Sequence, residues 1–206
     1  MAHHTEVVED LLAIEAVQIK TKQEEYFTWT SGIRSPIYCD NRLTMSFPDV
    51  RKKIVEAFID KVNQLSTKPD IIVGCATAGI PHAAWLAEAL NLPMAYVRSK
   101  PKGHGKGNQV EGQLLPGQNA LVIEDLISTG GSSIEAAQVV QDAGAEVIHV
   151  LAIFTYGLPK AERAFAEAGF SFTTITGYDT LLSVLKNQNQ INETEEQELL
   201  QWRNQL

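Results

Sequence analysis

Residues 119–133, NALVIEDLISTGGSS, combine the side chains that a phosphorylated sugar requires. An apolar run ends in two adjacent carboxylates, Glu124 and Asp125, and a turn of hydroxyl residues and glycines follows before a helical pattern begins at Ile134. Glycines let the backbone approach a ligand closely, and N–H groups at a helix start can cradle a phosphate. The carboxylates should face hydroxyl groups or a hard divalent cation. The combination predicts a binding site for a phosphorylated ribose.

The simpler interpretation of this stretch is an ordinary strand, turn and helix with a serine-rich cap. Small and hydroxyl residues are common at helix starts for capping alone. Paired acids, paired glycines and several hydroxyls together favour the functional interpretation. The sequence contains neither GxxxxGK[ST] nor a GxGxxG after a strand, which disfavours a nucleotide P-loop and a dinucleotide fold.

The segment IEDLISTGGSS resembles the signature of the type I phosphoribosyltransferases, which bind phosphoribosyl pyrophosphate (PRPP). The resemblance implies that Glu124 and Asp125 hold the ribose hydroxyls and that the turn binds the 5′-phosphate. It implies Mg²⁺ as cofactor, carried mainly by PRPP or through water by the two acids, with no dedicated protein site. The PRPP-binding residues implied here are Glu124, Asp125, Leu126, Ile127, Ser128, Thr129, Gly130, Gly131 and Ser132.

A basic, glycine-rich segment lies between the strands expected at 94–98 and 120–124. Cationic or titratable side chains occupy every second position, namely Arg98, Lys100, Lys102, His104 and Lys106. Such a segment in a chain of net charge −8 suits an anion, and a long connection of this kind is often a functional lid. The alternative is a solvated crossover without a ligand, which charge runs often are.

The segment YVRSKPKGHGKG (residues 96–107) resembles the catalytic loop of the orotate phosphoribosyltransferases, which we expect to span residues 99–112 with Arg98 just before it. The resemblance implies that Arg98, Lys102 and His104 are catalytic and contact the pyrophosphate in the neighbouring subunit's site. It therefore also implies a homodimer. Ser99 stands where many members have lysine.

Residues 27–42, FTWTSGIRSPIYCDNR, resemble the hood that covers the base in the same family. Phe27, Trp29 or Tyr38 could provide a stacking surface, although for Phe27 and Trp29 routine core packing is the simpler interpretation. The resemblance implies an orotate contact from the Ser128 hydroxyl, with Arg34 as a candidate helper.

Residues 73–83, VGCATAGIPHA, form a second strand-to-helix turn that resembles the family's pyrophosphate-facing loop. Backbone N–H groups of Thr77, Ala78 and Gly79 would be available there. Three positions depart from many orotate enzymes, which have lysines at the positions of Thr30 and Ala78 and an arginine near Tyr156.

The resemblances imply the reaction of orotate with PRPP to give orotidine 5′-monophosphate and pyrophosphate, a step of pyrimidine biosynthesis. One alternative is a phosphoribosyltransferase for another base, such as adenine or xanthine. A second is a non-catalytic, PRPP-sensing regulator that binds nucleic acid. The net charge of −8 argues against nucleic acid as a partner.

The elements that must position these residues follow from periodicity. A helix is expected up to about residue 15, two or three short strands within 16–40, and an amphipathic helix from Pro48 to Leu65. Strands are expected at 71–75, 94–98, 120–124, 146–154 and 171–176, and helices at 80–90, 132–143, 160–168, 178–186 and 193–206. Alternation of this kind predicts an α/β fold with a central parallel sheet flanked by helices.

We expect one type I phosphoribosyltransferase domain over residues 1–206. It comprises a helix and a small β-containing hood over about 1–45, a core over about 46–190 and a C-terminal helix over 191–206. A hydrophobic content of 44% and a charged content of 20% are ordinary for a soluble globular protein. We expect no signal peptide and no membrane span, two reduced cysteines and a cytoplasmic location.

Overall fold

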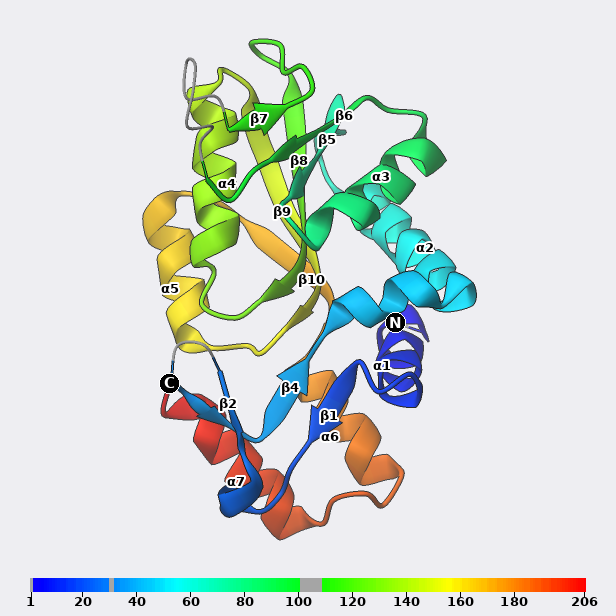
Figure 1. Cartoon of the computed structure of the whole chain (residues 1–206), viewed down its shortest axis with the longest axis vertical. Coiled ribbons are helices and arrows are strands. Elements are labelled where there is room, and N and C mark those ends of the chain that lie inside the picture. The colour runs from blue at the N-terminus through cyan, green and yellow to red at the C-terminus, as the bar shows by residue number, and fades with distance from the viewer. Residues whose placement is uncertain (1, 30–31, 101–108) are drawn as a thin grey trace.

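A six-stranded sheet forms the centre of the computed structural model, which describes residues 2–29, 32–100 and 109–206 (Figure 1). The spatial order of its strands is β10-β9-β8-β5-β6-β7, and all are parallel except β7, which runs antiparallel to β6. The strands are β5 (Ile71–Cys75), β6 (Met94–Val97), β7 (Val110–Glu111), β8 (Asn119–Ile127), β9 (Glu146–Thr155) and β10 (Phe172–Gly177).

Helices cover both faces of the sheet, as the alternating pattern predicts. On one face lie α1 (Ala2–Ala13), α2 (Pro48–Gln64), α3 (Gly79–Leu90) and α6 (Tyr178–Asn187), and on the other lie α4 (Gly131–Asp142) and α5 (Pro159–Ala168). Each face of the sheet has its own hydrophobic core, the first under α1, α2, α3 and α6 and the second under α4 and α5. The central strand β8 is apolar on both sides, because its Leu121 and Ile123 are buried in the first core and its Ala120 and Val122 in the second. The expected α/β architecture is confirmed.

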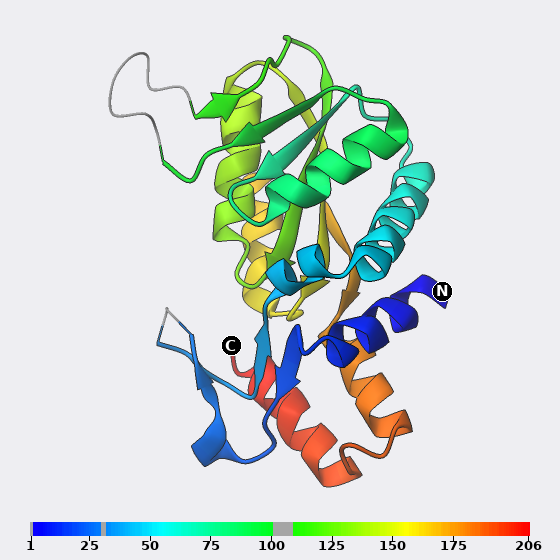
Figure 2. The ribbon, with the colours of Figure 1, turned by 45° about the vertical axis from the view of Figure 1, so that its right-hand side comes forward.

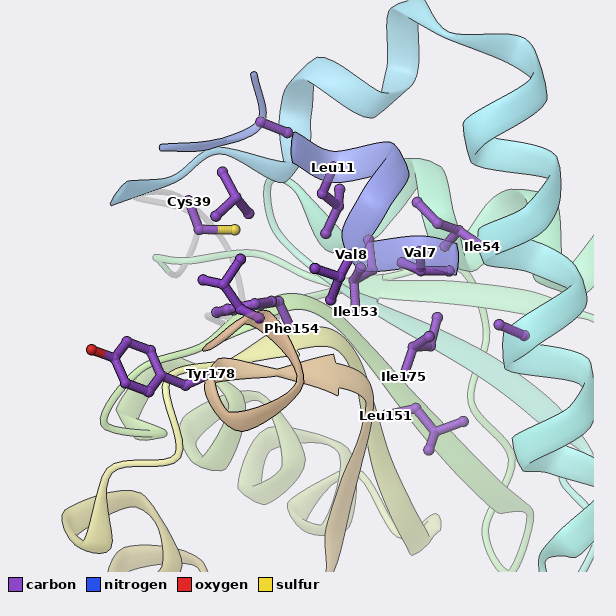
Figure 3. Close-up of a cluster of buried hydrophobic side chains, with 14 of the residues drawn as sticks. Val7, Val8, Leu11, Cys39, Ile54, Leu151, Ile153, Phe154, Ile175 and Tyr178 are labelled. Carbon is purple, nitrogen blue, oxygen red and sulfur yellow. The ribbon is translucent and has the colours of Figure 1, made fainter. Parts of the chain in front are cut away.

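The first core also anchors the N-terminal helix (Figure 3). Val7, Val8 and Leu11 of α1 are buried beside the inner face of β9 and β10, together with Ile153 and Ile175. Burial of these side chains holds the N-terminal segment against the sheet.

The N-terminal strands form two small antiparallel pairs at one end of the core, β1 (Val17–Ile19) with β4 (Ile37–Cys39) and β2 (Phe27–Thr28) with β3 (Arg34–Ser35) (Figure 2). We call residues 17–39 the hood. The 3₁₀ helix η1 (Gln23–Glu25) lies between β1 and β2, and the 3₁₀ helix η2 (Asn41–Ser46) follows β4.

The C-terminal helix α7 (Glu193–Asn204) lies beside the hood. Its Leu199 is buried, and Trp202 Nε1 donates a hydrogen bond to the Arg34 carbonyl oxygen at 2.8 Å. The helix therefore docks on the rest of the chain through these side chains.

Three elements differ from the sequence expectation. The hood contains four short strands rather than two or three, and the two-residue strand β7 was not expected. Strand β8 continues to Ile127, beyond the predicted end at residue 124, because its pairing with β9 extends to Thr155. The strand β7 and the extension of β8 depend on pairing with β6 and β9, which periodicity does not report.

Both cysteines, Cys39 and Cys75, are buried and free, as expected. No helix within the described residues is long and apolar enough to cross a membrane.

Candidate functional site

Two turns at the C-terminal ends of parallel strands lie next to each other. One connects β5 to α3 through residues 76–78, and the other connects β8 to α4 through residues 128–130. The start of α3 packs directly on β8, since a Cβ atom added at Gly79 would lie 2.4 Å from the Ile123 carbonyl oxygen. Glycine is therefore required at position 79 for this close approach.

The turn after β8 has the geometry of an anion cradle. Gly130 has a φ of +85°, which favours glycine, and helix α4 begins at the next residue. The first intrahelical bond there runs from Ile134 N to the Gly130 carbonyl oxygen at 2.9 Å. N–H groups in the first turn of a helix lack acceptors within the helix. No protein atom lies within 4 Å of a Cβ added at Gly131, so its backbone is open to a ligand.

The paired acids occupy different environments. Glu124 is only 6% exposed, and its carboxyl accepts hydrogen bonds from Asp125 N (3.1 Å) and Ser133 Oγ (3.4 Å). Burial and the neighbouring Asp125 charge raise the pKa of Glu124 well above its ordinary value. Asp125 is partly exposed; burial raises its pKa as well, and the Arg42 guanidinium is among the groups that oppose this rise.

A cavity of about 460 Å³ joins the hood to the turn after β8. Trp29 and Tyr38 from the hood and Tyr156 after β9 provide aromatic surface, and Ser128 and Thr129 provide hydroxyl groups. The rings of Trp29 and Tyr156 lie 4.6 Å apart between centroids. The complete lining consists of Thr28, Trp29, Ile33, Tyr38, Cys39, Leu126, Ser128, Thr129 and Tyr156. Such a cavity suits a flat, polar ring placed beside a bound phosphate.

Arg34 does not line this cavity. Its Nη2 donates to the carbonyl oxygens of Gln23 (2.5 Å) and Glu24 (3.3 Å), and its side chain lines a separate cavity with Tyr26 and Trp202. Arg34 and Ser128, which the resemblance places together at orotate, are thus apart in this structure. The role of Arg34 stays a prediction.

Arg98 lies beside the start of α4. Its Nη1 is 3.6 Å from Glu111 Oε1, and it lines a small cavity of about 60 Å³ together with Ser132. Lys102 and His104 lie outside the described residues, as does Thr30.

Asn41 and the stacking role of Tyr156 were not recognised from the sequence. The buried Asn41 donates from Nδ2 to the Asp125 carbonyl oxygen at 2.7 Å and so ties the segment after the hood to the end of β8. No local pattern could reveal this bond, because its partners are 84 residues apart.

Comparisons with known proteins agree with this geometry. Residues 47–174 match the model of the phosphoribosyl transferase domain. The chain is 58% identical to orotate phosphoribosyltransferase of Oceanobacillus iheyensis, over 98% of both chains. It is 54% identical to the enzyme of the same name from Fusobacterium nucleatum, over 98% of this chain and 95% of the relative.

Solved structures show the same fold. Orotate phosphoribosyltransferase from Aeropyrum pernix superposes with a TM-score of 0.77 at 26% identity, over 90% of this chain and 99% of that one. UMP synthase of Leishmania donovani gives a TM-score of 0.80 at 25% identity, and the match covers 98% of this chain but 42% of that longer one. The chain therefore belongs to the phosphoribosyltransferase family, among the orotate phosphoribosyltransferases.

Proposed function

We propose that this protein transfers the 5-phosphoribosyl group of PRPP to orotate, releasing orotidine 5′-monophosphate and pyrophosphate in pyrimidine biosynthesis. The observation that carries the proposal is the continuity of the two halves of the site. Ser128 and Thr129 belong to the turn before α4, which has the geometry of a phosphate-binding turn, and they also line the aromatic cavity. A base in the cavity would therefore lie beside a ribose whose phosphate occupies the turn.

PRPP binding is assigned to the end of β8 and the turn that follows it. Backbone N–H groups of residues 129–132 and the nearby hydroxyls bind the 5′-phosphate at the start of α4. Asp125, which is partly exposed, accepts hydrogen bonds from the ribose hydroxyls. Glu124 lies beside it, and the remaining residues of the signature, Leu126 and Ile127, position the strand end.

Orotate is assigned to the cavity under the hood. The Trp29 and Tyr156 rings, tilted by 42° to each other, offer apolar surface to the pyrimidine, and the Ser128 hydroxyl offers a polar contact. Deprotonated orotate N1 is a competent nucleophile, so much of the catalysis consists of holding it in line with ribose C1. Enclosure by the hood also keeps water from competing for the same carbon.

The leaving pyrophosphate needs positive charge, and we assign that charge to Arg98 and to Lys102 and His104 of the 99–112 loop that follows it. Stabilising charge where it develops is the largest catalytic effect available to such a site. Within its own chain, Arg98 lines a small cavity with Ser132 at the start of α4.

We propose that the protein is a homodimer in which this loop acts in the neighbouring subunit's site. Leu43, Met45 and Phe47, before and at the start of α2, are 40%, 37% and 40% exposed. Exposed apolar side chains in such proximity suit an interface between copies of the chain.

The residues present fit Mg²⁺ as a companion of PRPP. Among the described residues no group of three or more His, Cys, Asp or Glu side chains could hold a metal by itself. Mg²⁺ commonly binds through one or two carboxylates together with substrate phosphates, and Asp125 can supply an oxygen directly or through water. When bound, the ion would neutralise charge on the pyrophosphate.

We also propose a cytoplasmic location, since PRPP is a highly charged metabolite that does not cross membranes unaided.

A panel of bases tests the proposal. Pyrophosphate release would be measured with PRPP, Mg²⁺ and one of orotate, adenine or xanthine. We expect pyrophosphate to be released when the base is orotate and not when it is adenine or xanthine. Release with adenine or xanthine alone would reassign the base and keep the reaction class. No release with any base, together with salt-sensitive retention on DNA or RNA, would favour the regulator.

A further inference from the structure

A row of aromatic rings connects the C-terminal helix α7 to the cavity under the hood. The ring of Trp202 on α7 contacts Trp29 edge to face, with 6.1 Å between centroids, and Trp29 in turn lies 4.6 Å from Tyr156. Trp202 also lies 5.9 Å from the ring of Tyr178, the first residue of α6. Trp29 and Tyr156 line the cavity, whereas Trp202 is not among the described residues that do so. Any effect of Trp202 on a bound base is therefore indirect.

Trp202 also binds the backbone of the hood. Its Nε1 donates to the carbonyl oxygen of Arg34 in β3, and β3 pairs with β2, which Trp29 follows directly. Trp29 N donates to the Ile33 carbonyl oxygen at 2.9 Å, and Trp29 Nε1 donates to the Ile37 carbonyl oxygen at 3.3 Å. These bonds connect the position of the Trp29 ring to that of β3, which Trp202 holds from outside the hood.

The helix that carries Trp202 is itself fixed to the core. Leu199 is 1% exposed, and its carbonyl oxygen accepts a hydrogen bond from Tyr178 Oη at 3.0 Å. Arg203 forms an ion pair with Asp179, and its guanidinium lies 5.7 Å from the centroid of the Tyr178 ring. Contacts with α6 thus fix α7 where it meets the hood (Figures 1 and 2).

The hood depends on outside support of this kind. Its strands are two or three residues long and form two separate antiparallel pairs. Isolated pairs of this size are marginally stable in water, so contacts with the rest of the chain must fix their position. Trp202 provides two such contacts, one with a side chain and one with a carbonyl oxygen. The orientation of the Trp29 indole, and with it one wall of the cavity, therefore depends on α7.

We propose that Trp202 is a positioning residue for the base, because it holds the indole of Trp29 against Tyr156 and so keeps in place the wall on which orotate packs. The helix α7 is then part of the orotate site, although it contributes none of the described lining residues. This inference rests on the proposed function, because it takes orotate as the occupant of the cavity.

The first test measures kcat and the KM for orotate and for PRPP in variants of Trp202. Trp202→Leu removes both the edge-to-face contact and the hydrogen bond. We expect the KM for orotate to rise roughly threefold to fivefold, as the loss of one aromatic contact predicts. The kcat and the KM for PRPP should stay near their original values. Trp202→Phe keeps a ring against Trp29 and should restore most of the affinity for orotate.

Two controls separate positioning from stability. Leu199→Ala removes a buried side chain of the same helix. It should lower the thermal stability at least as much as Trp202→Leu does, while the KM for orotate stays near its original value. In the Trp29→Ala background, Trp202→Leu should raise the KM little further, because the residue through which Trp202 acts is already absent.

The fluorescence of Trp29 gives a second readout, which does not depend on turnover. The chain contains three tryptophans, so Trp85→Phe combined with a substitution of Trp202 leaves Trp29 as the single one. We expect acrylamide to quench Trp29 more efficiently when Trp202 is replaced by leucine than when it is replaced by phenylalanine. The reason is that an indole without its aromatic neighbour is more accessible to solvent.

An unchanged KM for orotate in Trp202→Leu would overturn the inference, and so would equal quenching in the two single-tryptophan proteins. An equal rise in the KM for PRPP, or in the KM for orotate of Leu199→Ala, would also overturn it by indicating general loosening of the fold. If the unaltered protein does not turn over orotate, the proposed function is wrong, and with it the claim about orotate. The quenching still decides whether Trp202 holds Trp29 in place.

Discussion

The ring of Trp29 in the hood lies 4.6 Å from the ring of Tyr156, which follows β9 in the core. Trp29 also contacts Trp202 of α7 edge to face at 6.1 Å and donates from Nε1 to the Ile37 carbonyl oxygen at 3.3 Å. Segments far apart in the chain thus meet at one wall of the cavity. The tryptophan that looked like an ordinary core residue in the sequence is both a packing residue and a lining residue.

Replacing Trp29 should weaken orotate binding more than PRPP binding. We expect Trp29→Ala to raise the KM for orotate on the order of tenfold, because the aromatic contact with Tyr156 and the apolar surface of the indole are lost. Trp29→Phe should recover most of the affinity. Phe27→Ala is the matched control, since Phe27 contacts Tyr38 at 5.6 Å but does not line the cavity. Equal KM changes for both substrates would contradict the assignment.

The glycines of the two turns should separate stability from ligand binding. Gly79→Ala would place a Cβ atom 2.4 Å from the Ile123 carbonyl oxygen, so we expect a loss of about 1–3 kcal/mol in the free energy of unfolding. Gly131→Ala meets no protein atom within 4 Å and should fold normally while losing PRPP affinity. Urea unfolding and calorimetry measure the two effects. Normal PRPP affinity in Gly131→Ala would argue against a phosphate at the start of α4.

How much of this site follows from the sequence depends on the range of each interaction. The turn at 128–131 was predicted, because glycines, hydroxyls and an apolar strand are local signals. The burial of Glu124 was not predicted. Only the packing of α3 and α4 around β8 makes Glu124 inaccessible while Asp125 stays partly exposed. Arg34 was a candidate for contacting orotate, yet its guanidinium bonds to the backbone of η1.

Lys102 should be needed for turnover more than for PRPP binding. We expect Lys102→Ala to lower kcat by about 10²-fold or more, as loss of charge stabilisation at a leaving group does. Thermal stabilisation by PRPP should persist. Lys160→Ala, which removes an exposed lysine on α5, is the control. Unchanged turnover in Lys102→Ala would remove the loop from the mechanism.

The sharing of sites between subunits has its own test. Lys102→Ala and Asp125→Asn should each be inactive, but mixing and re-equilibrating them should restore about a quarter of the original activity, because half the dimers are mixed and one of their two sites is intact. No recovery, with exchange of subunits verified, would indicate that each loop serves its own subunit.

His82 should make the protein sensitive to acid. It is 1% exposed, and burial lowers its pKa from 6.5 to about 4. The unfolded chain therefore binds a proton below pH 6.5 that the folded chain refuses until about pH 4, so stability falls as the pH drops through this window. At pH 5 the cost should be about 2 kcal/mol. His82→Gln should lose less stability than the original protein between pH 7 and pH 5. Identical losses in urea unfolding would contradict this role.

The most direct measurement of the central claim is the ultraviolet absorbance of orotate in the presence of the protein, PRPP and Mg²⁺. Conversion to the nucleotide changes the conjugated ring at N1, so we predict a loss of orotate absorbance that requires PRPP and is matched by an equal amount of pyrophosphate. The change should reverse when orotidine 5′-monophosphate and excess pyrophosphate are supplied instead. An absorbance that does not respond to PRPP, with protein shown to be folded, would contradict the account.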